Sequence, residues 1–232
     1  MEFFVDIAEV EDVKKVAEYF PIDGFTTNPN ILTKTEKSLS RNFKEYKEYI
    51  DETGYKLFVQ VTAEKAEDMA AQARCLKGYF GKNLVIKLPA VKEGYKALRL
   101  CKKEGLTICI TVVHSLNQAL LAAKGGADYI APYVSHIDNI GADGIRCVEE
   151  MVKAFQEYGY PSKVLGASFR TAEQIERLAN VGCHAVTITP QFFDLLIAHP
   201  STNEPMSMFN QSWRDRFGEL EVTDGLRATG TE

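Results

Sequence analysis

A single lysine, Lys87, interrupts an apolar segment that otherwise has the composition of a buried strand, Val85-Ile86-Lys87-Leu88-Pro89. A charged amine in such surroundings is costly unless it is paired or loses its proton. Burial disfavours the charged form of a lysine, and a neutral amine can attack a carbonyl carbon to form a Schiff base. The alternative is a structural lysine that reaches water or an ion-pair partner at a strand end. Lys87 is therefore the first candidate for a nucleophile.

Short apolar segments typical of strands alternate with amphipathic segments typical of helices along the whole chain. The predicted strands are Phe3–Ile7, Gly24–Asn28, Tyr55–Thr62, Leu84–Pro89, Thr107–Val113, Tyr129–Val134, Lys163–Phe169 and Ala185–Thr189. About eight strand–helix units without a linker predict an α/β fold, a (β/α)8 TIM barrel. A doubly wound open sheet is the alternative, because periodicity does not show that a sheet closes. Its dinucleotide-binding form is disfavoured because no GxGxxG sequence follows the first strand.

In a barrel of this kind the chemistry belongs at the carboxyl ends of the strands. The polar residues predicted there are Asp6, Thr26, Thr27, Asn28, Gln60, Lys87, Thr111, Tyr133, Ser168 and Arg170. Several have a simple structural explanation, since Asp6 and Ser168 could cap helices and Tyr133 could be a core ring. Together they predict a site that combines an amine, a carboxylate, a phenol, amides and a terminal cation.

The chain divides into one predicted catalytic domain and a short extension. Residues 1–200 form the barrel, and residues 201–218 form a helix with one apolar face, made of Met206, Phe209, Trp213 and Phe217. Residues 219–232 are polar and are predicted to be a flexible tail.

The composition is that of an ordinary globular protein. A net charge of −5 argues against a nucleic-acid partner, and no apolar segment approaches the length of a membrane span. The five cysteines lack paired spacing and the N-terminus lacks a basic signal sequence, so we expect reduced thiols and a cytoplasmic location. The four histidines lack ligand spacing, so we expect no metal site.

Five segments of the sequence resemble the transaldolase family, and they do so most closely in its small branch, the fructose-6-phosphate aldolases. These segments are Phe3–Asp6, Asp23–Pro29, Val85–Pro89, Ala131–Val134 and Gly166–Arg170. The resemblance extends in order from Met1 to about Gly218. It implies a cofactor-free class I aldolase in which Lys87, on the fourth strand, forms a Schiff base with a ketose. Fructose 6-phosphate or a similar sugar would be cleaved to dihydroxyacetone and an aldehyde such as glyceraldehyde 3-phosphate.

The same resemblance implies roles for the other candidates. Gln60, Thr111 and Tyr133 would hold a catalytic water, with Tyr133 as the proton-transfer group. Asp6 and Asn28 would bind substrate hydroxyls, and Thr26 would position the sugar chain. Asp6 could also transfer the proton, and the sequence does not choose between Asp6 and Tyr133.

Gln60 and Tyr133 are typical of the aldolase branch, because true transaldolases usually have glutamate and phenylalanine there. The nearest alternative is a transaldolase that transfers the dihydroxyacetone unit between sugar phosphates or from 6-deoxy-6-sulfofructose. An alternative of another class is a non-catalytic sugar-phosphate-binding barrel.

This chain departs from the family pattern after Tyr133-Val134. Relatives usually have an arginine there that binds the substrate phosphate, whereas this sequence has Ser135-His136. His136 could substitute, and Ser168 with Arg170 near a helix start could still hold a phosphate. The head group of the substrate could therefore be a phosphate, a sulfonate or uncharged. Resemblance to the small aldolases also implies a homo-oligomer, a pentamer or a decamer, joined through the C-terminal helix.

Overall fold

The computed structural model describes residues 1–227 of the 232-residue chain. It divides into two compact units, Met1–Phe193 and Asp194–Glu232. None of the helices described is long and apolar enough to cross a membrane.

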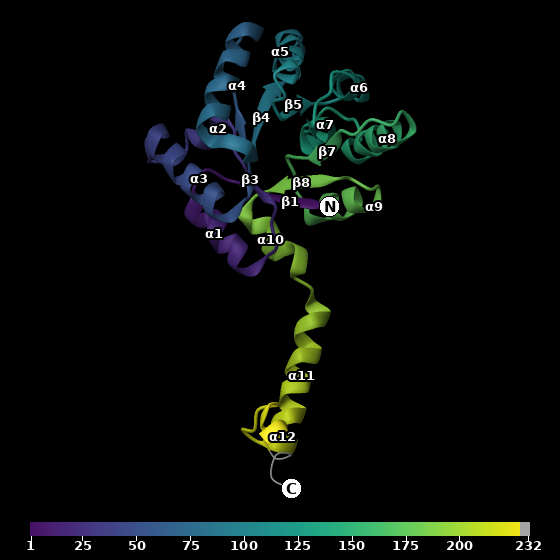
Figure 1. Ribbon diagram of the computed structural model, residues 1–232. Coiled ribbons are helices and arrows are strands. Elements are labelled where there is room, and N and C mark those ends of the chain that lie inside the picture. The colour runs from purple at the N-terminus through teal and green to yellow at the C-terminus, as the bar shows by residue number, and fades with distance from the viewer. Residues whose placement is uncertain (228–232) are drawn as a thin grey trace. The chain divides into compact units, whose positions relative to one another are not determined.

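The first unit is built around eight parallel strands that close into a barrel (Figure 1). The strands are β1 (Glu2–Asp6), β2 (Gly24–Thr26), β3 (Lys56–Gln60), β4 (Leu84–Pro89), β5 (Ile108–Val113), β6 (Tyr129–Pro132), β7 (Lys163–Gly166) and β8 (Ala185–Ile188). Each strand pairs with the next, and β8 pairs with β1 through contacts such as Phe4 opposite Thr187. The predicted (β/α)8 barrel is confirmed, and the open sheet is excluded.

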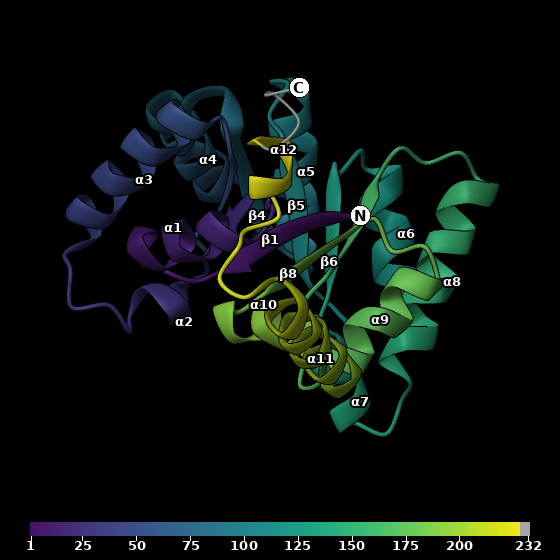
Figure 2. The ribbon, with the colours of Figure 1, turned by 90° about the horizontal axis from the view of Figure 1, so that it is seen from below.

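Helices lie around the outside of the strands (Figures 1 and 2). They are α1 (Val10–Tyr19), α2 (Pro29–Leu32), α3 (Leu39–Thr53), α4 (Ala66–Phe80), the 3-10 turn η1 (Gly81–Asn83), α5 (Lys92–Lys103), α6 (Leu116–Lys124), α7 (Val134–Asn139), α8 (Gly144–Glu157), α9 (Ala172–Asn180) and α10 (Pro190–Ile197). Several begin at a side chain that accepts a backbone N–H, as sequence chemistry predicts. At α9, Thr171 and Gln174 form a complete capping box.

Two apolar layers hold the barrel together. The interior layer contains only strand residues: Phe4, Phe58, Val85, Cys109, Tyr129, Ala131, Leu165 and Ala185. The larger outer layer joins the opposite faces of the strands to the helices. Because side chains alternate along a strand, each strand contributes to both layers.

A polar cluster lies at the amino end of the barrel, beneath the interior layer. The Glu2 carboxylate accepts hydrogen bonds from Lys56 Nζ at 2.5 Å and from Tyr129 Oη at 2.9 Å, and Lys163 Nζ lies 3.1 Å away. Both lysine amines also lie over the Tyr129 ring, at 5.6 and 5.8 Å. We call these four residues the floor cluster.

The second unit consists mainly of α11 (Pro200–Phe217), followed by the short helix α12 (Asp224–Arg227). Within it, Trp213 packs on Phe217 at 4.7 Å and donates a hydrogen bond from Nε1 to the Leu220 carbonyl at 2.7 Å. Met206 and Phe209 are exposed. The predicted extra C-terminal helix is therefore present, and the last five residues of the predicted tail, 228–232, lie outside the described residues.

Candidate active site

A cavity of about 1080 Å³ opens at the carboxyl ends of the strands. Nine of the eleven residues singled out from the sequence line it, namely Asp6, Thr26, Asn28, Gln60, Lys87, Thr111, Tyr133, His136 and Ser168. Thr27 and Arg170 are not among its lining residues. The strand ends thus bring together side chains that are far apart in the sequence.

Lys87 lies near the end of β4 and is only 5% exposed. Its Nζ donates a hydrogen bond to the backbone carbonyl of Thr27 at 2.9 Å. Among residues 1–227 it has no carboxylate within ion-pair distance. A buried amine held by a carbonyl at the wall of a large cavity is suited to attack a carbonyl carbon.

Asp6, at the end of β1, is the carboxylate that influences Lys87 electrostatically. Burial raises the pKa of Asp6 above its ordinary value, although the charge of Lys87 and the hydrogen bond from Thr26 oppose that rise. Thr26 Oγ1 donates to Asp6 Oδ1 at 2.6 Å, and Thr187 Oγ1 lies 2.6 Å from Thr26 Oγ1. Since Thr26 gives its proton to Asp6, Thr187 must donate to Thr26. This chain of hydroxyls fixes the orientation of the carboxylate.

Thr27 and Asn28 shape the turn after β2. The Thr27 hydroxyl is buried and donates to the Phe58 carbonyl, while Asn28 Oδ1 accepts from the Ile31 N–H at 3.0 Å and caps α2. Asn28 therefore has the capping role as well as a place on the cavity wall. Its amide nitrogen remains available to a substrate hydroxyl.

Tyr133 follows β6 and is held between two neighbouring strands. Its N–H donates to the Val113 carbonyl at 3.0 Å, and its backbone forms a parallel bridge with Ala167. Its hydroxyl lies 3.5 Å from Thr111 Oγ1, at the long limit of a hydrogen bond. Both residues also line the cavity.

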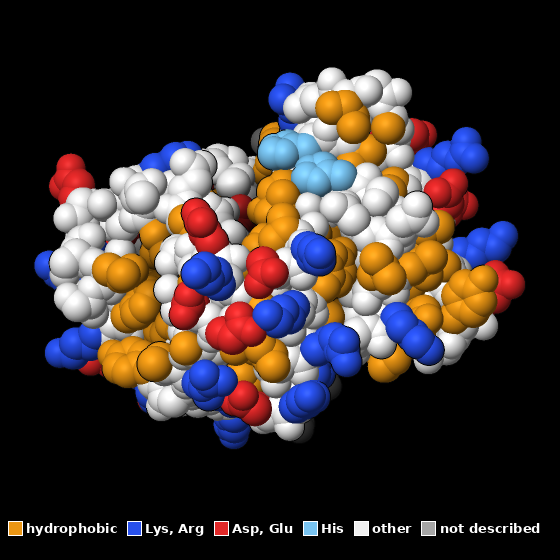
Figure 3. Space-filling model, turned by 90° about the horizontal axis from the view of Figure 1, so that it is seen from above, with side chains coloured by type: hydrophobic (Ala, Val, Ile, Leu, Met, Phe, Trp, Pro, Cys, Tyr) orange, Lys and Arg blue, Asp and Glu red, His pale blue; other side chains and the backbone are white. Residues whose placement is uncertain are grey.

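His136 extends the site toward the rim. On the face in Figure 3, two histidine side chains lie side by side. The rings of His114 and His136 are stacked, with centroids 5.9 Å apart, and the Tyr133 ring meets His136 edge-on at 5.2 Å. The sequence reasoning missed His114, although it follows directly after the fifth predicted strand.

Ser168 and Arg170, predicted together as an anion site, lie differently in the structure. Ser168 lines the cavity and has a positive φ of 60°. The Arg170 side chain is exposed, and its backbone N–H donates to Gln174 Oε1 at 2.8 Å. The structure therefore brings Ser168, but not the Arg170 guanidinium, to the cavity wall.

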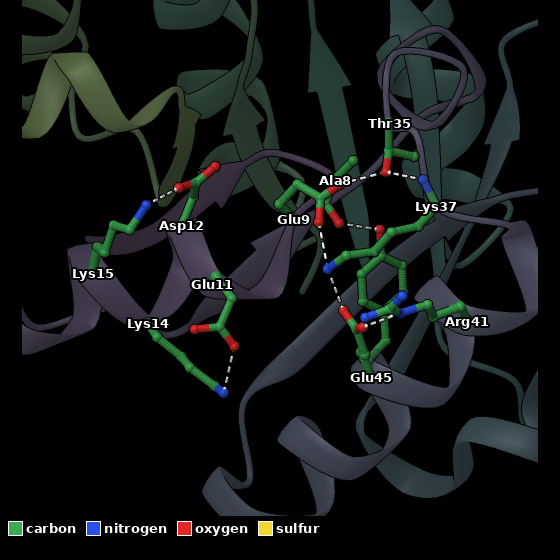
Figure 4. A network of polar contacts seen from close by, with 11 residues as sticks. Ala8, Glu9, Glu11, Asp12, Lys14, Lys15, Thr35, Lys37, Arg41 and Glu45 are labelled. Carbon is green, nitrogen blue, oxygen red and sulfur yellow. Dashed lines mark hydrogen bonds and ion pairs between the residues drawn. The ribbon is translucent and has the colours of Figure 1, made fainter.

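The loop between α2 and α3 forms another part of the wall and is held by an ionic network (Figure 4). Lys37 Nζ lies 2.6 Å from both Glu9 and Glu45, and Thr35 donates to Glu9. Hydrogen bonding to Lys37 holds the pKa values of both carboxyl groups below their ordinary range. No local pattern in the sequence indicated this network. No local pattern indicated Thr187 either, which hydrogen-bonds to Thr26 beside Asp6.

Residues 1–227 contain no group of three or more His, Cys, Asp or Glu side chains that could hold a metal ion. The polar groups of the cavity instead suit hydroxyl, carbonyl and anionic groups of a small molecule.

Comparisons with known proteins identify related sequences. The sequence model for the family described as transaldolase/fructose-6-phosphate aldolase matches residues 3–231. The chain is 35% identical over 214 residues to a probable transaldolase of Lactiplantibacillus plantarum, an alignment that covers 92% of this chain and 97% of that protein.

Solved structures with similar folds share little sequence with this chain. A thiamine phosphate pyrophosphorylase from Pyrococcus furiosus matches with a TM-score of 0.57 and 16% identity over 81% of this chain and 85% of that one. A mandelate oxidase variant matches with a TM-score of 0.57 and 15% identity over 93% of this chain and 74% of that one. At this level of identity the likeness concerns the barrel fold alone.

Proposed function

The chain belongs to the transaldolase/fructose-6-phosphate aldolase family, and on that premise we propose that it is a class I aldolase acting through Lys87. The reaction is the reversible cleavage of fructose 6-phosphate, or a similar ketose, to dihydroxyacetone and an aldehyde. The observation that carries the proposal is the Lys87 amine, buried in the cavity wall without an ion-pair partner among the described residues.

In this mechanism Lys87 attacks the ketose carbonyl, and loss of water gives an iminium ion. The iminium accepts the electron pair of the breaking carbon–carbon bond and becomes an enamine. At the same time the hydroxyl on the carbon at the other end of the breaking bond loses its proton, and that carbon becomes the aldehyde. Protonation of the enamine and hydrolysis of the iminium then release dihydroxyacetone and the free lysine.

Two groups are positioned to take the hydroxyl proton, Tyr133 and Asp6. A catalytic acid or base works best when its pKa lies near the working pH, and burial moves the pKa of Asp6 in that direction. The hydroxyls of Tyr133 and Thr111 lie 3.5 Å apart and line the cavity, as does Gln60, so a water beside them could be held by these side chains. Because Asp6 already accepts a hydrogen bond from Thr26 and interacts electrostatically with Lys87, we assign to it the stabilisation of the cationic intermediates. The proton transfer we assign to Tyr133 with this water.

The substrate hydroxyls would meet Asn28 and Thr26, and the anionic head group would lie toward His136 and Ser168. Lys34 is a further cation on the cavity wall, and within residues 1–227 it has no ion-pair partner. A phosphate or a sulfonate would both suit this wall.

Transaldolase activity is the second candidate, and the full-length likeness to a probable transaldolase favours it. The two reactions share the enamine and differ in its fate, because a transaldolase passes it to a second aldehyde. Gln60 and Tyr133 favour release, since both can hold the water that hydrolysis requires.

Incubation with fructose 6-phosphate and no acceptor separates the candidates. An aldolase releases free dihydroxyacetone in step with glyceraldehyde 3-phosphate, whereas a transaldolase stops after a single turnover until erythrose 4-phosphate is added. A panel of fructose, sedoheptulose 7-phosphate and 6-deoxy-6-sulfofructose then identifies the head group. A non-catalytic binding barrel would turn over none of them, and its ligand binding would survive Lys87→Met.

A further inference from the structure

Strand β5 contains a residue in a conformation that its side chain disfavours. Val112 has a φ of 61°, in the left-handed region. Branched side chains such as valine are genuine outliers there, because Cβ crowds the backbone. Such a conformation persists only where the surrounding structure requires it.

The backbone irregularity changes the direction of two side chains. Pairing with β6 runs from Thr111 opposite Ala131 directly to Val113 opposite Pro132, so Val112 is an inserted residue of the bulge type. Regular alternation after Thr111 would point Val112 toward the helices and Val113 into the cavity. Instead Val112 lines the cavity, and Val113 is fully buried in the outer layer.

A second residue with a positive φ lines the cavity on the other side of Tyr133. Ser168, after β7, also has a positive φ, and both it and the preceding Ala167 line the cavity. The segment after β6 forms a backbone hydrogen bond at each of these irregular positions. The Tyr133 N–H donates to the Val113 carbonyl, and the Ser135 N–H donates to the Ser168 carbonyl. The left-handed conformation at Val112 is therefore fixed by the pairing that also positions Tyr133.

Neighbours along β5 locate Val112 within the site. Thr111, on one side, lies 3.5 Å from the Tyr133 hydroxyl, and His114, two residues beyond, stacks on His136. Val112 thus lies on the wall between the proton-transfer groups and the rim. The residue is 36% exposed, so its apolar side chain offers a surface that a bound molecule could cover.

We propose that Val112 is a specificity-determining residue for the aldehyde that leaves or joins at this wall. Its isopropyl group limits the width available beside Tyr133. Aldehydes with one carbon substituent next to the carbonyl, which include glyceraldehyde 3-phosphate, are therefore accepted, and aldehydes with two carbon substituents there are excluded. This inference rests on the proposed function. The step concerned forms a bond from the enamine carbon to the aldehyde carbon. The aldehyde oxygen takes a proton, and water then frees the product and Lys87.

Two aldehydes that differ by one methyl group test the proposal, propanal and 2-methylpropanal, each with dihydroxyacetone as donor. The quantity measured is the ratio of kcat/KM for propanal to that for 2-methylpropanal. Because one carbon can change specificity more than tenfold, Val112→Ala and Val112→Gly should lower this ratio at least about fivefold. Val112→Thr, which keeps the branched shape, should keep the ratio within about twofold of wild type.

Val91 supplies a matched control. It is an exposed valine that follows β4 but does not line the cavity, so Val91→Ala should leave the ratio unchanged. Formation of the Lys87 adduct with dihydroxyacetone, trapped with borohydride, should be the same in all the Val112 variants. The reason is that Val112 is proposed to contact the aldehyde, whereas the adduct forms between Lys87 and dihydroxyacetone.

Melting temperatures test the conformational part of the argument. In an ordinary strand alanine is more stable than glycine, but at a φ of 61° the order should reverse, with Val112→Gly at least as stable as Val112→Ala. A glycine variant that melts below the alanine variant contradicts the left-handed assignment and overturns the proposal.

The kinetic outcomes separate this inference from the function on which it rests. A wild-type protein that forms no dihydroxyacetone adduct contradicts the proposed function and this inference with it. If wild type forms the adduct but the Ala and Gly variants keep its aldehyde ratio, only the role of Val112 is wrong. Loss of the adduct in those variants would also overturn it, because the residue would then affect the whole site.

Discussion

Lys87 is held by a carbonyl, and this choice of partner matters for its chemistry. A carboxylate in ion-pair contact would hold the proton on the amine, whereas the Thr27 carbonyl accepts a hydrogen bond from either the charged or the neutral form. The carbonyl therefore satisfies the hydrogen-bonding need of the buried amine without an ion pair. Asp6 remains close enough to influence the charge electrostatically without a direct contact.

At the same scale, we expect Asp6 to lower the stability of the fold at neutral pH while it raises the rate of cleavage. Its raised pKa means that its contribution to stability is present at low pH and is lost as the pH rises through the raised value. At neutral pH the buried carboxylate is therefore a cost. Because Asp6 is assigned the stabilisation of cationic intermediates, we expect Asp6→Asn to lower cleavage about 100-fold without lowering the melting temperature at neutral pH. Thermal unfolding and steady-state rates at pH 7 check this, and a large fall in melting temperature would show that Asp6 is mainly structural.

The anionic end of the site should depend more on His136 than on Arg170, because His136 lines the cavity and Arg170 does not. His136→Ala should raise KM for fructose 6-phosphate about three- to tenfold, and Arg170→Ala less than about twofold. Adduct formation with uncharged dihydroxyacetone is the control and should be unaffected. A larger effect of Arg170→Ala would mean that its side chain turns inward when substrate binds.

At the scale of elements, the floor cluster joins β1, β3, β6 and β7 through one carboxylate. Burial alone would raise the pKa of Glu2, but hydrogen bonds from Lys56, Tyr129 and Lys163 lower it below the ordinary value. The stability that Glu2 contributes is thus present above the pKa of the unfolded chain and is lost as the pH falls through the lowered value.

We therefore expect Glu2→Gln to cost about 1–2 kcal/mol of unfolding free energy at pH 7. The difference from wild type should shrink as the pH falls below the normal range for glutamate. Urea unfolding at neutral and acidic pH measures both quantities. A difference independent of pH would show that packing, and not the charge of Glu2, is what the cluster provides.

The elements themselves could largely be predicted from the sequence, because apolar periodicity reports which faces are buried. All eight strands appear at their predicted places, although several are shorter than predicted. β3 is shorter at both ends, and β2, β6 and β7 are shorter at their carboxyl ends. Lys87 was found because a charge within a buried strand is a local anomaly. Thr187 was missed because its role depends on a contact with Thr26, 161 residues away, which exists only once the barrel closes. The conformation of Val112 likewise follows from pairing with β6, and nothing in its local sequence demands it.

At the scale of the whole molecule, the apolar residues of α11 suggest how copies of the chain associate. Met206, Phe209, Trp213 and Phe217 are all exposed. We propose that this face is covered in a homo-oligomer, a ring of five or two such rings. Sedimentation at micromolar concentration should give an oligomer, and Phe209→Asp should reduce its size.

Leu121 on α6 offers a control for this experiment, because it is as exposed as Phe209, at 64%, but lies on another helix. Leu121→Asp should leave the assembly intact. A wild-type monomer, or equal effects of the two substitutions, would refute the role of α11.

The most direct test of the whole account is to trap the covalent intermediate. After incubation with dihydroxyacetone and borohydride, the peptide that contains Lys87 should gain the mass of a reduced three-carbon adduct. Lys87→Met keeps the buried stem and removes only the amine, so it should abolish both the label and the cleavage without unfolding the barrel. Lys34→Met removes a second lysine from the same cavity and should still be labelled at Lys87. Label on another lysine, or turnover by Lys87→Met, would contradict the mechanism.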